Sequence, residues 1–260
     1  MAVIDVISFN GEFDLLDLRL NILSPHVDKF IVVEFDKTFS GKKKPFYGKD
    51  MDKFLELWKG KIEWHYNTEK TYEKYRELAE SSPNTKGAEH WKREFMQKES
   101  IKDCLTDLND ENIVIIGDCD EIPDMDIVLK WCHAPFKWRM KVYTYWLNNR
   151  SSEQFWGFIC SPYKFIKNSC LNDLRNSAWK TITEGGWHFT SMGGYDKVKE
   201  KLTDSYTQDS YATKQVLNNL EDNIKESRDF LGRDFKYKID ESEWPEYLKQ
   251  HKDKYSQLCL

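Results

Sequence analysis

Short apolar stretches alternate with helical patterns in the first half of the chain. Residues 3–9 and 30–33 are apolar runs rich in β-branched residues, and leucines at 15, 16, 18, 20 and 23 follow helical spacing between them. A strand, a helix and a second strand within the first 34 residues predict a βαβ unit with a parallel strand pair. A further strand is expected at 62–66. The pattern is that of an α/β fold.

The most informative stretch is 113–123. Its first four residues, 113–116, are apolar and indicate a strand buried on both faces, entered from a helical pattern over 88–108. Asp118, Asp120 and Glu121 follow where this strand ends. In open α/β sheets, ligands bind in the crevice beyond the carboxyl ends of the strands. The three carboxylates are therefore candidates for a binding site.

The arrangement Asp118-x-Asp120 suits a divalent cation. Carboxylate oxygens are hard ligands that bind Mg²⁺ or Mn²⁺, and a diphosphate supplies further oxygens. A structural alternative is an acidic turn in which Asp124 caps a helix that begins at Met125. Short acidic motifs have many false positives, so the spacing alone leaves both interpretations open.

The second half of the chain changes from strands to polar helices. The strands and helices that its pattern predicts cover 137–147, 155–165, 187–189, 197–206 and 212–230. The lysine-rich end of the chain, from Lys236, has the composition of a mobile segment. The sequence predicts one catalytic domain over 1–205, with a helical extension over 206–260 packed on it.

Composition and charge narrow the function classes. The net charge of -5 argues against nucleic-acid binding as the main role. The six cysteines lack CxxC spacing, which predicts free thiols in a reducing compartment. Neither a signal peptide nor an apolar run of membrane-spanning length is present, so a soluble, cytoplasmic protein is expected. Aromatic residues make up 15% of the chain, which suits stacking on sugars as well as core packing.

Four separated segments together are similar to glycosyltransferase family 17, whose best-known members add the bisecting N-acetylglucosamine to N-glycans. They cover about positions 5 to 205 in the family's order. These segments are 9–12, 27–41, 91–98 with 117–123, and 185–194.

The resemblance implies a GT-A type fold, with a Rossmann-like, mostly parallel central sheet flanked by helices. It also implies a metal-dependent, inverting transfer of N-acetylglucosamine or a related hexose. The donor would be a UDP-sugar, the acceptor a hydroxyl of a glycan, and the cofactor Mn²⁺ or Mg²⁺. The chain shows neither the membrane anchor nor the long stem of the eukaryotic members. It therefore looks more like a compact bacterial or viral one.

The resemblance also assigns roles to individual residues. Asp118, Asp120 and His188 are expected to hold the metal, although a core histidine bonded to backbone is an alternative for His188. Glu184 and then Asp173 are favoured, ahead of Glu153, as the general base that takes the proton of the acceptor hydroxyl. Glu184 could instead be a solvated turn residue.

The donor is expected to contact residues at the ends of the first strands and on two helices. Arg93 and Gln97 lie one helical turn apart and could instead brace the edge of the sheet. Arg175 is a further cation suited to a phosphate, and Arg19 could be structural, paired with Glu12 or Glu34. The predicted donor-binding residues are Asn10, Glu34, Thr38, Gly41, Arg93, Gln97, Asp118 and Lys197.

The acidic motif is also compatible with two other classes of function. In phosphotransferases of the haloacid-dehalogenase kind, Asp-x-Asp carries a nucleophile and an acid beside Mg²⁺. Those enzymes place Thr or Val where Ile122 stands here, and their motif follows the first strand of the chain. A non-catalytic glycan-binding protein would not need the Asp118 and Asp120 pair, which is intact.

Overall fold

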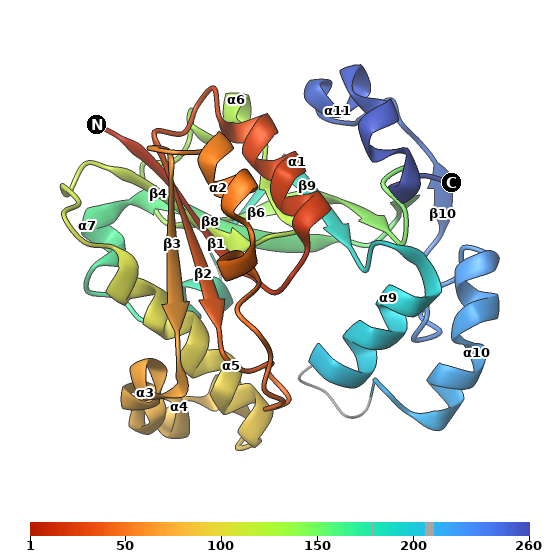
Figure 1. The fold of residues 1–260 in the computed structure, drawn as a ribbon, viewed down its shortest axis with the longest axis horizontal. Helices are drawn as coiled ribbons and strands as arrows, with labels where there is room; N and C mark the ends of the chain where they lie inside the picture. The colour runs from red at the N-terminus through yellow and green to blue at the C-terminus, as the bar shows by residue number, and fades with distance from the viewer. Residues whose placement is uncertain (178, 206–210) are drawn as a thin grey trace.

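The computed structural model describes residues 1–177, 179–205 and 211–260 (Figure 1). Within these ranges the strands form one 10-stranded sheet in the order β10-β7-β6-β8-β4-β1-β2-β3, to which β5 and β9 are joined through β6. The strands are β1 (Val3–Phe9), β2 (Lys29–Phe35), β3 (Ile62–Asn67), β4 (Ile113–Asp118), β5 (Glu121–Pro123), β6 (Phe136–Thr144), β7 (Asn149–Ser151), β8 (Phe155–Pro162), β9 (Lys180–Thr190) and β10 (Tyr237–Ile239).

Helices flank this sheet (Figure 1). The α-helices are α1 (Phe13–Leu23), α2 (Asp52–Leu57), α3 (Glu69–Tyr72), α4 (Arg76–Ser81), α5 (Glu89–Ser100), α6 (Met125–Val128), α7 (Tyr163–Ile166), α8 (Leu171–Asn176), α9 (Gly194–Glu200), α10 (Lys214–Lys225) and α11 (Glu246–Gln250). Shorter helical turns are η1 (Tyr47–Asp50), η2 (Glu73–Tyr75), η3 (Pro83–Thr85), η4 (Ile101–Cys104), the π-helical η5 (Lys201–Ser205) and η6 (Lys252–Leu258).

The first strands form the parallel part of the sheet, as the sequence predicts. β1 pairs in parallel with β2 and with β4, and β2 pairs in parallel with β3. Since parallel strands end at the same edge, Phe9, Glu34 and Asp118 finish side by side. The α/β class and the largely parallel central sheet are thus confirmed, and they are consistent with a Rossmann-like fold of the GT-A type.

Two hydrophobic clusters lie on the two faces of this parallel part. Val3, Ile7 and Phe9 pack with the leucines of α1, whereas Ile4 and Val6 pack with residues of α5. Alternate residues of a strand point to opposite faces, so this division follows from the period of β1. The two-sided cover explains why these strands are almost continuously apolar.

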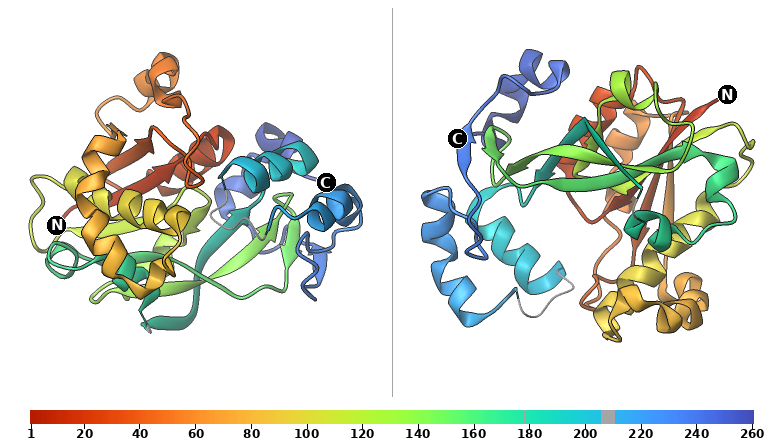
Figure 2. Two further views of the ribbon diagram at one scale, coloured as in Figure 1. Left: turned by 90° about the horizontal axis from the view of Figure 1, so that it is seen from below. Right: turned by 180° about the vertical axis from the view of Figure 1, so that it is seen from behind.

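The later strands are mostly antiparallel, and they lie at the other end of the sheet (Figure 2). A third cluster is formed there by Tyr145 with buried residues of α9 and α10. The helix expected over 88–108 is shorter than predicted. It ends at Ser100 and continues as η4, because Ile101, Cys104 and Leu105 all enter the core.

The expectation of a mobile tail from Lys236 was wrong. Tyr237–Ile239 pairs with β7, and Trp244, Leu248 and Tyr255 are buried in the largest cluster. Spaced aromatic and leucine residues therefore outweigh the high lysine content of this segment. All six cysteines are free thiols, as the sequence predicts.

Candidate active site

The segment Asp118-Cys119-Asp120-Glu121 turns sharply between β4 and β5, and backbone contacts hold it on two sides. Cys119 N donates to the carbonyl of Ser8 at 3.2 Å, and the carbonyl of Asp120 accepts from Phe189 N at 2.9 Å. Glu121 is the register partner of His188 in the β5–β9 pair. These pairings bring β9, almost seventy residues later in the chain, against the acidic turn.

Arg19 supports the same turn from inside the protein. Its guanidinium binds both carboxylate oxygens of Asp5, at 2.8 and 2.7 Å, and both side chains are fully buried. Arg19 Nη1 also donates to the backbone carbonyls of Asp118 and Glu121. The expected partners of Arg19, Glu12 or Glu34, are therefore wrong, and its role is to hold the acidic turn.

Asp120 and His188 face each other at the edge of the sheet. Asp120 Oδ2 lies 3.4 Å from His188 Nε2 and 3.9 Å from Lys201 Nζ, where Lys201 begins η5. Burial raises the pKa of the Asp120 carboxyl, but the charges of His188 and Lys201 outweigh it and hold that pKa below its usual range. Burial lowers the pKa of His188, and Asp120 outweighs that effect and raises it overall.

Asp118 is surrounded by cations. Its Oδ2 atom lies 3.3 Å from Lys98 Nζ, on α5, and 3.1 Å from Arg175 Nη2, on α8. Arg175 also binds both oxygens of the buried Glu121, at 2.6 and 3.2 Å. Burial raises the pKa of Asp118, and Lys98 and Arg175 together lower it by more. Lys98 Nζ also lies 2.9 Å from Glu94 Oε1, so the two cations are shared among the carboxylates of Asp118, Glu121 and Glu94. Their N–H groups are donors of the kind that bind phosphate oxygens.

Glu12 is a carboxylate at this site that the sequence did not single out. It follows β1, is exposed, and accepts a hydrogen bond from Asn10 N at 2.9 Å. Loss of solvent around the carboxyl raises the pKa of Glu12, the bond from Asn10 opposes this, and the charge of Asp120 raises it further. Glu12 and Asp120 are therefore within electrostatic reach of each other. Lys98 and Lys201 were not predicted as site residues either, although Lys98 ends the segment 91–98 that carries the family resemblance.

Glu34 lies at the end of β2, but its carboxylate is directed into the protein. The side chain is fully buried and accepts hydrogen bonds from Tyr47 N at 2.5 Å, Gly48 N at 3.1 Å and Trp64 Nε1 at 3.1 Å. Lys44 Nζ lies 3.5 Å from it. Glu34 therefore anchors the loop that follows β2.

Replacing Glu34 by Gln should lower the free energy of unfolding by about 1–3 kcal/mol, because an amide NH₂ would oppose buried N–H donors. Urea denaturation measures the loss. Glu63→Gln is the matched control, since Glu63 pairs with Lys29 on the surface, where both side chains are more than a third exposed. That control should cost less than about 1 kcal/mol. Equal losses in both variants would contradict the anchoring role.

Arg93 and Gln97 hold a second part of the same loop. Arg93 Nη1 donates to the carbonyl of Phe39 at 2.8 Å, and Gln97 Nε2 donates to the carbonyl of Lys37 at 2.9 Å. A Cβ atom added at Gly41, which has a φ of 94°, would lie 3.0 Å from the guanidinium of Arg93. The close approach of α5 to this loop therefore requires glycine there.

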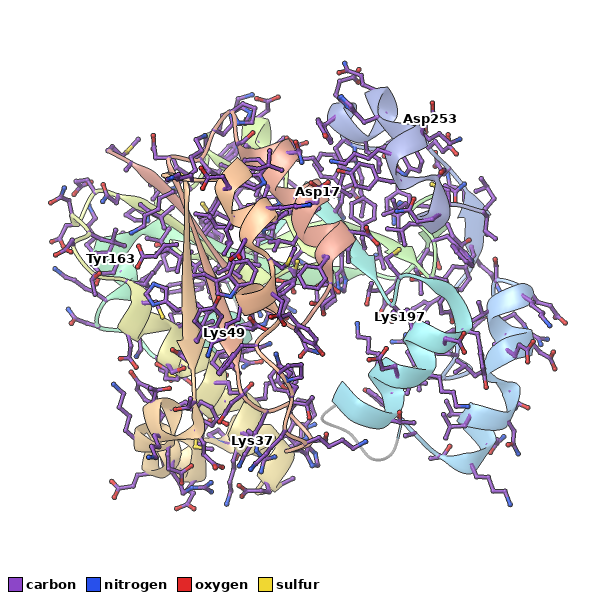
Figure 3. The ribbon with its side chains drawn as sticks, viewed as in Figure 1. Asp17, Lys37, Lys49, Tyr163, Lys197 and Asp253 are labelled. Atoms are coloured by element: carbon purple, nitrogen blue, oxygen red, sulfur yellow. The ribbon has the colours of Figure 1, made fainter. Side chains whose placement is uncertain are left out.

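Thr38 and Lys197 lie on two different elements, the loop after β2 and helix α9. Thr38 stabilises the tip of the loop, where Gly41 N donates to its carbonyl at 2.9 Å. Lys197 lies on α9 (Figure 3) and pairs with Glu200 at 3.1 Å. Lys42 Nζ, in the loop after β2, donates to the carbonyl of Thr203 at 3.3 Å, so η5, which directly follows α9, contacts this loop.

The two candidates for the general base lie apart from the acidic turn in their contacts. Glu184 Oε1 is 3.7 Å from Arg139 Nε and 3.9 Å from Arg150 Nη2. Asp173 is exposed on α8. The structure therefore brings together Asp118, Asp120 and His188, with Arg175 from α8.

Asp120 and its neighbour His188 supply part of a ligand set for a divalent cation. A carboxylate and an imidazole nitrogen, which are both suitable ligands for Mn²⁺, converge there. Among residues 1–177, 179–205 and 211–260, no cluster of three His, Cys, Asp or Glu side chains has the spacing of a complete metal site. A cation bound by Asp120 and His188 would therefore take its remaining ligands from a diphosphate or from water.

The sequence model of glycosyltransferase family 17 matches residues 1–219. The chain belongs to this family. It is also similar to the β-1,4-mannosyl-glycoprotein 4-β-N-acetylglucosaminyltransferases of Rattus norvegicus and Homo sapiens, with 33% identity over 129 residues in each case. That segment is 49% of this chain and 22% or 23% of the relatives, so the chain spans a minor part of their length. Within the described part of this family 17 protein, no helix is both long and apolar enough to cross a membrane.

Proposed function

We propose that this protein transfers a sugar, N-acetylglucosamine or a related hexose, from a UDP-sugar to a hydroxyl of a glycan. The observation that carries the proposal is the convergence of Asp118, Asp120 and His188 at the carboxyl edge of the parallel strands. Lys98 and Arg175 stand directly beside them. This is the edge at which α/β sheets bind nucleotides. Family membership and the names of the relatives support the same reaction class.

The chemistry requires stabilisation of the departing diphosphate, which gains negative charge as the bond to the sugar breaks. Lys98 and Arg175 would bind phosphate oxygens, and Arg19 keeps the backbone of the acidic turn in place for them. Asp120 and His188 would hold Mn²⁺ or Mg²⁺, which supplies positive charge to the diphosphate when it is bound. Glu34, Arg93 and Gln97 would act on the donor indirectly, by shaping the loop after β2.

An inverting transfer needs one carboxylate to take the proton of the acceptor hydroxyl. The sequence favours Glu184, followed by Asp173, for this role. We propose Glu12 instead, since its side chain is exposed and its backbone carbonyl lies 3.9 Å from Cys119 Sγ in the acidic turn.

Glu12→Gln should lower turnover by about 10²–10⁴-fold while donor binding persists, because only the proton acceptor is removed. Glu184→Gln and Asp173→Asn are the matched carboxylate-to-amide variants. Transfer rates over a pH series measure the effect. In the wild type we expect the rate to rise with pH as Glu12 loses its proton, and this rise should be absent in Glu12→Gln. A larger loss of turnover in Glu184→Gln would return the role to Glu184.

Donor and metal dependence are tested together by titrating UDP-N-acetylglucosamine with and without Mn²⁺ and following the melting temperature. A ligand that binds the folded state raises this temperature. We expect the melting temperature to rise when the UDP-sugar and Mn²⁺ are both present. With the UDP-sugar alone the rise should be smaller. A UDP-sugar that produces no shift under any condition, with no transfer to any glycan, would contradict the proposed function.

A further inference from the structure

A second group of polar side chains lies on β6, β7 and β9, away from the acidic turn. Trp187 and His188 are consecutive in β9, so their side chains point to opposite faces of the strand. His188 faces Asp120, whereas Lys141 Nζ lies 5.8 Å from the centre of the Trp187 ring on the other face. We define the mixed-charge surface on that face as Arg139, Lys141, Tyr143, Arg150, Glu184 and Glu243.

The ion pairs of the mixed-charge surface are loose. Arg150 Nε lies 3.6 Å from Glu243 Oε2, Lys141 Nζ lies 3.5 Å from Glu243 Oε1, and both contacts to Glu184 exceed this distance. Hydrogen bonds of the N–H···O type are 2.7–3.2 Å long. The charged groups are therefore close enough to neutralise one another. Arg150 Nη1 donates to the carbonyls of Val142 and Ser151, at 3.1 and 2.7 Å, whereas Arg139, Lys141 and the two carboxylates keep donor and acceptor positions for a ligand.

Two buried polar atoms in this surface have no hydrogen-bond partner among the described residues. They are Arg139 Nε and the hydroxyl of Tyr143, whose side chain is fully buried. Burial raises the pKa of Tyr143, Arg150 lowers it, and Glu243 and Glu184 raise it further, which places the hydroxyl among these charges. A buried hydroxyl without a partner costs stability, so a water molecule or a ligand group that reaches it would be stabilised there.

The chemistry of the surface selects the class of ligand. The surface contains three cations and two carboxylates. Glu184 and Glu243 would repel an anionic ligand, and the arginines would repel a cationic one. Neighbouring sugar hydroxyls both donate and accept, and they can therefore satisfy both kinds of group. Trp156 is the antiparallel partner of Arg139 and so shares its face, where its half-buried ring adds the flat apolar surface that sugars contact.

We propose that the mixed-charge surface binds a neutral oligosaccharide, as a subsite for a part of the acceptor that does not react. The proposal rests on the proposed function in one respect, namely that the acceptor is a glycan. Glu184 is the register partner of Arg139 and His188 that of Val142, three residues later on β6, which corresponds to roughly 10 Å along the strand. The subsite is therefore distinct from the position of the donor. Glu184 acts there as a ligand for hydroxyl groups.

The test uses the full chain and an array of neutral oligosaccharides beside their sulfated counterparts. The strongest neutral ligand is then titrated by calorimetry against the wild type and Arg139→Gln/Glu184→Gln, which removes one charge of each sign. We expect the double variant to bind about tenfold more weakly, the equivalent of one or two hydrogen bonds. Tyr143→Phe should also weaken binding while its melting temperature stays at or above that of the wild type.

Lys167→Gln/Asp110→Asn is the matched control, because it removes an exposed ion pair elsewhere on the surface and should leave the affinity unchanged. The proposal fails if no neutral oligosaccharide binds the wild type, if sulfated ones bind in preference, or if both double variants bind equally well. Near-ultraviolet circular dichroism confirms that each variant is folded. Asp120→Asn should weaken donor binding and keep oligosaccharide affinity. A wild-type protein that binds a neutral oligosaccharide but no UDP-sugar would overturn the proposed function and leave the subsite standing.

Discussion

Asp120→Asn is expected to lower sugar transfer by about 10²–10³-fold, the usual cost of removing one group that stabilises developing charge. The carboxylate lies 3.4 Å from His188 Nε2 and 3.9 Å from Lys201 Nζ, and the amide would leave both cations without their counter-charge. A neutral amide is also a weaker ligand for Mn²⁺ than a carboxylate. Transfer rates measured across a Mn²⁺ series give the loss and show whether added metal restores part of the rate.

The control for this variant is Asp126→Asn, the same substitution at an exposed position in the first turn of α6. Its transfer rate should match that of the wild type. If Asp120→Asn bound and turned over the donor as well as the wild type does, the assignment of the acidic turn as the donor site would be wrong. Equal losses in the two variants would point to a general effect on this segment.

Arg19→Met should produce the largest loss of stability, about 3–5 kcal/mol in the free energy of unfolding. The substitution leaves the Asp5 carboxylate fully buried without its cation. It also removes the donor to the backbone carbonyls of Asp118 and Glu121, so donor affinity should fall together with stability. Urea unfolding, monitored by circular dichroism, measures the first effect.

Two further variants separate the causes. Asp5→Asn/Arg19→Met removes the buried charge and should recover part of the stability, but not the support of the acidic turn. Lys254→Met breaks the partly exposed pair between Lys254 and Asp17 of α1 and should cost less than about 1 kcal/mol. A loss in Arg19→Met no larger than that in Lys254→Met would show that the buried pair contributes little.

The contacts of single residues differ in how far they could be predicted. The sequence places Asp118 and Asp120 at a strand end, since an apolar run followed by carboxylates is a local pattern. It does not show that Asp5 pairs with Arg19, because that contact depends on how α1 packs across β1. It also does not show that Glu34 faces inward, because the N–H groups that bind it belong to a loop that folds back.

The sequence by itself determines the βαβ unit at the beginning of the chain, the parallel strands and the acidic turn at their edge. Helical and strand periods are patterns of residues that are close in sequence, so they can be recognised without the structure. Only the tertiary structure decides which distant side chains meet that turn. Lys98, Arg175 and His188 come from α5, α8 and β9, and only strand pairing and helix packing bring them to Asp118 and Asp120. The same packing directs Glu184 to Arg139 and Arg150, on the face opposite His188, although four residues separate it from His188 in the chain.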